Sequence, residues 1–244
     1  ELPALTAHPA WRELPAVRQV VLIPMADGRD RGPAPPASVW WDDWLAGDPL
    51  REFDRFPFHH PLYVLYSSGT TGVPKCIVHG AGGTLIQHLK EHQLHCDIRA
   101  GDRVFYFTTC GWMMWNWLVS ALAVGSTVVL YDGAPFAPAQ RAGIGQDRPH
   151  TDLLWQMAED EAITVFGTSA KYLAIAEKEG LTPRSHRRLG ALRAMLSTGS
   201  PLAPPSFDYV YREIKADVQL SSISGGTDII SCFALGNPAG PVWR

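Results

Sequence analysis

The stretch YVLYSSGTTGVPKCIVHG, residues Tyr63–Gly80, is the most informative part of the sequence. A run of aromatic and β-branched residues ends in a loop of serine, threonine and glycine, and a lysine follows at Lys75. Glycines let a backbone approach a ligand closely, and hydroxyl groups with free N–H groups suit phosphate oxygens. The GxxxxGK[ST] nucleotide loop does not match, because Pro74 and the apolar run at 76–79 favour a hairpin over a helix. The stretch therefore predicts a phosphate-binding loop between two strands, with a polar surface turn as the alternative.

The composition excludes several classes of protein. The chain has 244 residues, is 46% hydrophobic and 18% charged, and is thus globular, with enough residues for one large or two small domains. A net charge of −3 without a basic block argues against a nucleic-acid-binding protein. No apolar run is long enough to span a bilayer, and the N-terminus lacks a signal-peptide pattern. The four cysteines lie far apart and form no CxxC, which favours reduced thiols and a cytoplasmic location.

The rest of the sequence predicts an α/β fold. Strand-like runs alternate with helix-like segments, which is typical of a doubly wound, mostly parallel sheet with helices on both faces. The strand-like runs are residues 102–109, 126–133, 163–169, 192–200 and 217–229, and the helix-like segments are residues 80–96, 112–125, 151–162, 170–180 and 204–215. In such sheets, ligands bind where the strands end.

Two regions are expected along the chain. Residues 1–60 contain one short strand, a Pro-rich loop and a short helix, and we interpret them as the trailing part of a preceding subdomain plus an irregular linker. Residues 61–244 form the α/β region. The chain begins without Met in a Pro-rich stretch and ends at GNPAGPVWR, a pattern that suggests the start of a new strand, so we expect a fragment of a larger protein.

Four motifs, in chain order, resemble those of the adenylate-forming superfamily, which includes acyl-CoA synthetases, luciferases and peptide-synthetase adenylation domains. YSSGTTGVPK (66–75) is similar to the superfamily's signature loop, GWMMWNW (111–117) to its aromatic acyl-pocket segment and STGSPLAPP (197–205) to the segment that lies against adenine. SSISGGTDII (221–230) is similar to the segment that in most members ends in Thr-Glu. Within the superfamily, residues 110–135 and 224–229 most resemble the acetoacetyl-CoA synthetases.

The resemblance implies a two-step reaction that uses ATP, Mg²⁺ and coenzyme A. The carboxylate of an acid attacks the α-phosphate of ATP to give an acyl-adenylate and pyrophosphate, and the coenzyme A thiol then displaces AMP. The implied catalytic residues are Lys75, Thr227 and Asp228. The expected nucleotide contacts are Ser67, Ser68, Gly69, Thr70, Thr71, Gly72 and Lys75 with the β- and γ-phosphates, Gly199, Ser200 and Pro201 with adenine, and Thr227 with the α-phosphate. Asp228 would hold Mg²⁺. Asp228 stands where most members have Glu, and its side chain is one methylene shorter. It could therefore contact the ion either directly or through a bridging water.

The resemblance also indicates the acid. In acetyl-CoA synthetases, a tryptophan two residues before the threonine of the Thr-Glu motif closes the acid pocket, and here that position is Gly225. The missing indole would leave room for a longer acid. Trp112 would form the opposite wall, with Met113, Met114 and Thr198 nearby, and the hydroxyls of Ser222 and Ser224 could meet a keto oxygen. These features together favour acetoacetate. Ordinary helix packing is the alternative for Trp112, and the better explanation for Trp115 and Trp117.

Two other functions compete with this one. HLKEH (His88–His92) matches the inverted zinc-protease pattern HxxEH on a predicted helix, so that His88, Glu91 and His92 could bind zinc. A non-catalytic nucleotide-binding module is the second alternative. The superfamily's Thr-Gly-Asp segment and its small C-terminal domain with the adenylation lysine do not occur in these residues. We therefore expect this chain by itself to be inactive or very weak.

Overall fold

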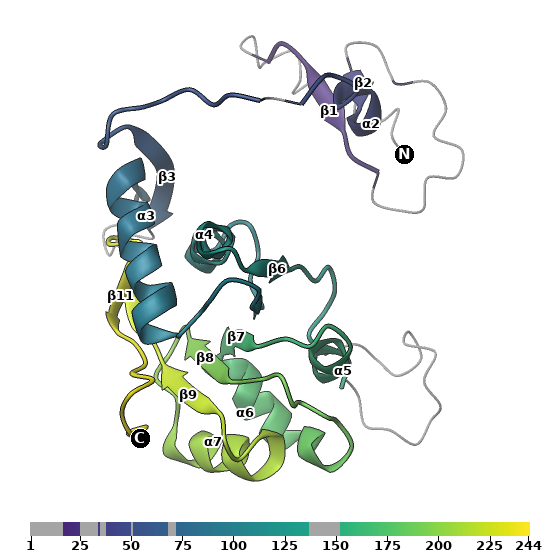
Figure 1. Ribbon diagram of the computed structural model, residues 1–244, viewed down its shortest axis with the longest axis vertical. Helices are drawn as coiled ribbons and strands as arrows, with labels where there is room; N and C mark the ends of the chain where they lie inside the picture. Colours follow the sequence, from purple (N-terminus) through teal and green to yellow (C-terminus); the bar gives the residue numbers. More distant parts are fainter. Residues whose placement is uncertain (1–16, 25–33, 35–37, 50, 68–71, 137–151) are drawn as a thin grey trace. The chain divides into compact units, whose positions relative to one another are not determined.

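The computed structural model describes residues 17–24, 34, 38–49, 51–67, 72–136 and 152–244, which belong to two compact units (Figure 1). The first unit is Glu1–Arg55 and the second is Phe56–Arg244. In the first, strands β1 (Val20–Leu22) and β2 (Ser38–Trp40) pair in parallel, and the short helix α2 (Trp41–Trp44) follows directly. The second unit contains all the residues for which the sequence predicts a role.

A five-stranded parallel sheet forms the centre of the second unit. Its strands, in spatial order, are β6 (Thr127–Val129), β5 (Arg103–Tyr106), β7 (Val165–Ser169), β8 (Ala194–Thr198) and β9 (Gln219–Ser222). Strand β6 lies outside β5, whereas β7, β8 and β9 follow on its other side, so the chain winds in both directions from β5. This arrangement confirms the predicted doubly wound α/β fold, and it brings the carboxyl ends of the strands to one edge.

Helices cover both faces of this sheet. The described helices of the second unit are α3 (Ala81–Lys90), α4 (Met113–Ser120), α5 (Leu153–Asp160), α6 (Ala170–Lys178) and α7 (Pro204–Tyr209), with π-helical turns η2 (Glu91–His95) and η6 (Val210–Ile214) and 3₁₀ turns η3 (Ala121–Val124) and η5 (Pro183–Ser185). Alternate strand residues face opposite ways. Phe166 packs with α5, α6 and α7 in one buried cluster, whereas its neighbour Val165 packs with α4 in the other. None of the helices in the described part of the chain has the length and apolarity needed to cross a membrane.

Two antiparallel ribbons accompany the parallel sheet. Strand β3 (Pro61–Ser67) pairs with β4 (Lys75–Gly80), which confirms the predicted hairpin. Strand β10 (Ser224–Gly226) pairs with β11 (Ser231–Ala234) beside α3 and β9 (Figure 1). The run at 217–229 was expected to be one strand and its loop, but it divides into β9 and β10, which belong to different sheets. Strand β11 was not predicted.

Candidate active site

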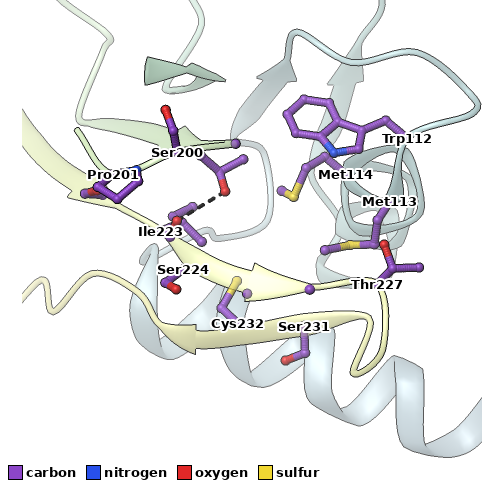
Figure 2. Close-up of a pocket in the computed structure, with 15 residues that line it drawn as sticks. Trp112, Met113, Met114, Ser200, Pro201, Ile223, Ser224, Thr227, Ser231 and Cys232 are labelled. Carbon is purple, nitrogen blue, oxygen red and sulfur yellow. Dashed lines mark hydrogen bonds between the residues drawn. The ribbon is translucent and has the colours of Figure 1, made fainter. Parts of the chain in front are cut away.

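A cavity of about 410 Å³ lies at the carboxyl ends of β8 and β9. In Figure 2, Trp112 and Met114 lie on one side of it, Ser200 and Pro201 lie on the other, and the β10–β11 ribbon runs along it. Its lining comes from four segments that are far apart in the sequence: Trp112, Met113 and Met114, then Thr198, Gly199, Ser200 and Pro201, then Ser222, Ile223, Ser224, Gly225, Gly226 and Thr227, and finally Ser231 and Cys232.

The cavity unites all the residues that the sequence assigned to the acid and to adenine, and Thr227, which it assigned to the α-phosphate. Those in its lining are Trp112, Met113, Met114, Thr198, Gly199, Ser200, Pro201, Gly225 and Thr227, together with the two serines Ser222 and Ser224. Asp228 is exposed and follows the last lining residue of its segment.

The predicted phosphate loop is described only at its two ends. Ser67 and Lys75 lie opposite each other on β3 and β4, Gly72 has the positive φ of +95° that favours glycine, and none of the three lines the cavity. Ser68, Gly69, Thr70 and Thr71 lie outside the described residues.

Backbone and hydroxyl contacts fix the turn after β8. Gly199 has a φ of +91°, a conformation in which a side chain would be strained. The Thr198 hydroxyl donates to the carbonyl of Ile223 (3.2 Å), and the N–H of Leu202 donates to the Ser222 hydroxyl oxygen (3.2 Å). These bonds join the turn directly to the end of β9 and to the segment between β9 and β10. Ser222 can still donate its own hydroxyl proton, because a serine oxygen both accepts and donates.

Gly225 has a packing role that its sequence motif did not indicate. A Cβ atom at this position would lie 2.2 Å from the carbonyl oxygen of Ser231 and 2.9 Å from the Cα of Cys232. A side chain at 225 would therefore meet the backbone of β11. On this backbone, the glycine is required by the close approach of the two strands, which is a different reason from the volume of a missing indole.

The tryptophans of GWMMWNW divide between the cavity and the core. Trp112 lines the cavity and packs edge-on against Tyr106, with ring centroids 6.1 Å apart. Trp117 is completely buried and also packs edge-on against Tyr106, with ring centroids 6.0 Å apart. Trp115 is partly buried against the same cluster. The packing explanation therefore applies to Trp115 and Trp117, while Trp112 is in place to contact a ligand.

The HLKEH motif forms a buried hydrogen-bond network behind the β10–β11 ribbon. His88, Glu91 and His92 are all fully buried. The carboxylate of Glu91 accepts hydrogen bonds from protein groups, and His88 bonds to the carbonyl of Ile230 and to the Ser120 hydroxyl. Among the described residues, no group of three or more His, Cys, Asp or Glu side chains is arranged to hold a metal ion. The structure thus contradicts the zinc-site alternative, because the carboxylate and His88 already have protein partners.

Burial makes this network sensitive to acid. Desolvation lowers the pKa of His88, and it lowers that of His92 to about 3, where the neighbouring His88 also contributes. An unfolded histidine titrates near 6.5, so below that pH the unfolded chain binds protons that the folded chain does not. The stabilisation is therefore complete above about pH 6.5 and is lost as the pH falls towards about 3.

We expect the free energy of unfolding to decrease by up to about 1.4 kcal/mol per pH unit for each of these histidines as the pH falls below about 6.5. Urea unfolding at about pH 7, 6 and 5 measures this slope. A His92→Gln variant should have a shallower slope, while His60→Gln, at an exposed position, should keep the original slope. An unchanged slope in His92→Gln would contradict the assignment.

Sequence reasoning missed several residues of the site. Ser231 and Cys232 line the cavity from β11, whose short SCFA pattern gave no strand signal. Glu91 was considered only as part of a metal motif. The sequence offered no signal for its role, because its partners Trp117 and Ser231 are 26 and 140 positions away.

Comparisons with known proteins agree with this geometry. The model of the family described as AMP-binding enzyme matches residues 2–241. The acetoacetyl-coenzyme A synthetase of Rhizobium meliloti is 57% identical over 92% of this chain and 33% of that protein, and the acetoacetyl-CoA synthetase of Danio rerio is 51% identical over 95% and 34%. The solved structure of acetoacetyl-CoA synthetase from Streptomyces lividans superimposes with a TM-score of 0.81 at 44% identity, covering 95% of this chain and 34% of that one.

The chain thus spans about a third of the length of the relatives that it matches. The family match extends over nearly all of its residues, and the cavity unites residues of three of the four motifs that resemble the adenylate-forming superfamily. On this evidence, the chain belongs to the AMP-binding enzyme family.

Proposed function

We propose that this chain supplies most of the ATP and acid site of an AMP-forming acid–thiol ligase that converts acetoacetate to acetoacetyl-CoA. In the first step, the acid carboxylate attacks the α-phosphate of ATP, giving acetoacetyl-adenylate and pyrophosphate. In the second, the thiol of coenzyme A displaces AMP and forms the thioester. The observation that carries the proposal is the single cavity that joins Trp112, the Gly199–Pro201 turn and Thr227. Relatives named acetoacetyl-CoA synthetase support the choice of acid.

The proposed roles follow the cavity from one side to the other. The acid lies between Trp112 and the β10–β11 ribbon, and adenine lies against Gly199, Ser200 and Pro201. Thr227 hydrogen-bonds the α-phosphate, and the imidazole of His79, bonded to the Thr227 carbonyl at 2.8 Å, supports it from behind. In this way the protein orients the reacting groups and stabilises the charge that develops on phosphate.

The polar groups along the cavity suit a keto acid. Thr198 already donates its proton to Ile223, so Ser222 and Ser224 are the hydroxyls that we assign to the keto oxygen. The volume of about 410 Å³ lies within the range of small-molecule sites and exceeds the need of acetate.

The phosphate loop and the metal complete the proposed site. Residues 67–72 and Lys75 surround the β- and γ-phosphates, and the ammonium group of Lys75 offsets their negative charge. Asp228 is the proposed Mg²⁺ residue. Its carboxylate fits a hard cation and is exposed next to Thr227, and the bound ion would neutralise phosphate charge.

The organisation of the chain is part of the proposal. We assign the ATP- and acid-binding region to residues 61–244, and residues 1–60 to the trailing part of a preceding subdomain with its linker. The compact unit around the cavity begins at Phe56. All four cysteines are free thiols, which suits the reducing cytoplasm. No residue of this chain is assigned to coenzyme A.

The test is ATP–pyrophosphate exchange by the full-length protein as encoded by its gene, with acetate, acetoacetate, butyrate and 3-hydroxybutyrate. We expect kcat/KM for acetoacetate to exceed that for acetate by roughly tenfold or more, which is the usual effect of additional groups that fit a pocket. A preference for acetate would refute the choice of acid. Exchange with none of the acids would refute the ligase function and leave a nucleotide-binding module.

A further inference from the structure

Glu91 is a buried carboxylate whose partners are neutral. It is fully buried at the start of the π-helical turn η2, and no ion pair involves it within the described part of the chain. Its Oε2 accepts from the indole N–H of Trp117 (2.9 Å), and its Oε1 accepts from the Gln87 amide (3.0 Å). Burying a charge in this way is costly, and an apolar side chain would avoid the cost. A role beyond packing would explain why a carboxylate occupies the position.

The other partners of this carboxylate belong to the cavity. Oε1 of Glu91 also accepts hydrogen bonds from the Ser231 hydroxyl and from the backbone N–H of Cys232, the latter at 2.9 Å. Ser231 and Cys232 are the two residues that β11 contributes to the lining. One carboxylate oxygen thus holds the strand that closes the cavity on this side.

Neighbouring side chains hold the same segment at other points. His88 donates from Nε2 to the carbonyl of Ile230 (2.6 Å), and His79 donates from Nε2 to the carbonyl of Thr227 (2.8 Å). The segment 227–232 is therefore attached to β4, α3 and η2 at both of its ends. π-Helical turns such as η2 recur at functional sites, because the extra residue redirects a side chain. Here, η2 begins at the residue that holds β11.

We propose that Glu91 is a positioning residue for the acid pocket: it holds β11 against β10 and so fixes the position of the cavity wall that Ser231 and Cys232 form. The expected change in KM rests on the proposed ligase function, whereas the expected change in the alkylation of Cys232 does not. The hydroxyl of Ser231 donates to Glu91 and accepts from Gln87. It therefore holds the strand in place and does not bind the substrate.

The principal test is Glu91→Gln in the full-length protein. Glutamine keeps the size of the side chain but has one oxygen, so its amide N–H₂ group must face either the Trp117 indole or the three donors at Oε1. We expect KM for the acid to rise roughly tenfold, while KM for ATP stays within about twofold. The matched control is Tyr209→Phe, which removes a buried hydrogen bond to Leu181 (2.8 Å) in the other core cluster. The control should lose stability and keep both KM values.

A second readout does not depend on activity. Burial raises the pKa of the Cys232 thiol to about 12, and the charge of Glu91 contributes to the rise. Removing that charge and loosening β11 should increase the alkylation rate of Cys232 by iodoacetamide roughly fivefold, as measured by peptide mass spectrometry. Tyr209→Phe should leave the rate unchanged. If the wild type shows no exchange with any acid but the alkylation rate still rises, the positioning role stands and the ligase function falls.

A milder variant covers the case in which Glu91→Gln does not fold. Gln87→Leu removes one donor to Glu91 and one to Ser231, from a position that is partly exposed. It should raise KM for the acid and the alkylation rate of Cys232 in the same direction, to a smaller extent. The decisive variant is Glu91→Gln, or Gln87→Leu if Glu91→Gln does not fold. The proposal would be overturned if that variant kept both the KM for the acid and the alkylation rate of Cys232 unchanged.

Discussion

Replacing Gly225 with tryptophan is expected to lower exchange with acetoacetate and with acetate alike, by roughly a hundredfold or more, because a misplacement of about 1 Å at a reacting centre has effects of that size. The Cβ atom alone would lie 2.2 Å from the carbonyl oxygen of Ser231, so β10 must move away from β11 before any larger group fits. This movement would displace Ser224 and Thr227 from the cavity lining. A change of specificity to acetate would require the indole to enter the cavity on the present backbone.

The measurement is ATP–pyrophosphate exchange with both acids, together with the melting temperature of each variant. Gly225→Ala isolates the first atom of the side chain and should cost about 1–3 kcal/mol of stability, as overpacking does. Gly83→Ala is the matched control, because the added Cβ of this exposed helical glycine meets nothing within 4 Å. Retained acetate exchange in Gly225→Trp, with only acetoacetate lost, would contradict the packing argument and restore the argument from pocket volume.

Gly225 illustrates what local sequence can and cannot predict. The alternation of apolar strands and amphipathic helices predicted the parallel sheet, since each of those elements has a period that can be recognised from its own residues. The resemblance to adenylate-forming enzymes, and not periodicity, placed Gly225 in the acid site, and the residue does line the cavity. The glycine is needed because β11 lies close to β10. Gly225 and its neighbour Ser231 are several positions apart in the sequence and are joined by a turn. No periodic pattern in three or four residues could have indicated it.

Glu91 illustrates a second limit. HLKEH has the spacing of a metal site, and a helix does bring its histidines and glutamate together, so the spacing was interpreted correctly. The distinction between a ligand set and a hydrogen-bond network depends on partners such as Trp117 and Ser231, which come from separate elements. Burial of a carboxylate among neutral donors is a property of the folded chain. Sequence alone therefore indicated which residues meet, but not what they do.

Asp228 is the other residue for which a large effect is expected. Asp228→Asn should lower kcat for adenylation by roughly 10²–10³-fold, the usual cost of losing a group that stabilises developing phosphate charge. The carboxylate is exposed, and none of the hydrogen bonds or ion pairs among the described residues engages it, so a purely structural cost is small. The measurement is kcat as a function of Mg²⁺ concentration, since loss of a metal ligand should also shift the Mg²⁺ dependence upward. Asp217→Asn is the matched control, at an exposed aspartate whose side chain pairs with Lys215.

Asp228→Glu then separates the two ways in which the carboxylate can act. If Asp228 contacts the ion through a bridging water, the longer glutamate reaches it directly, and activity should stay within about tenfold of the wild type. If the contact is direct, the added methylene pushes the ion out of place, and the variant should lose activity as Asp228→Asn does. Full activity of Asp228→Asn at low Mg²⁺ would contradict both, because the phosphates and water would then hold the ion without help from this residue.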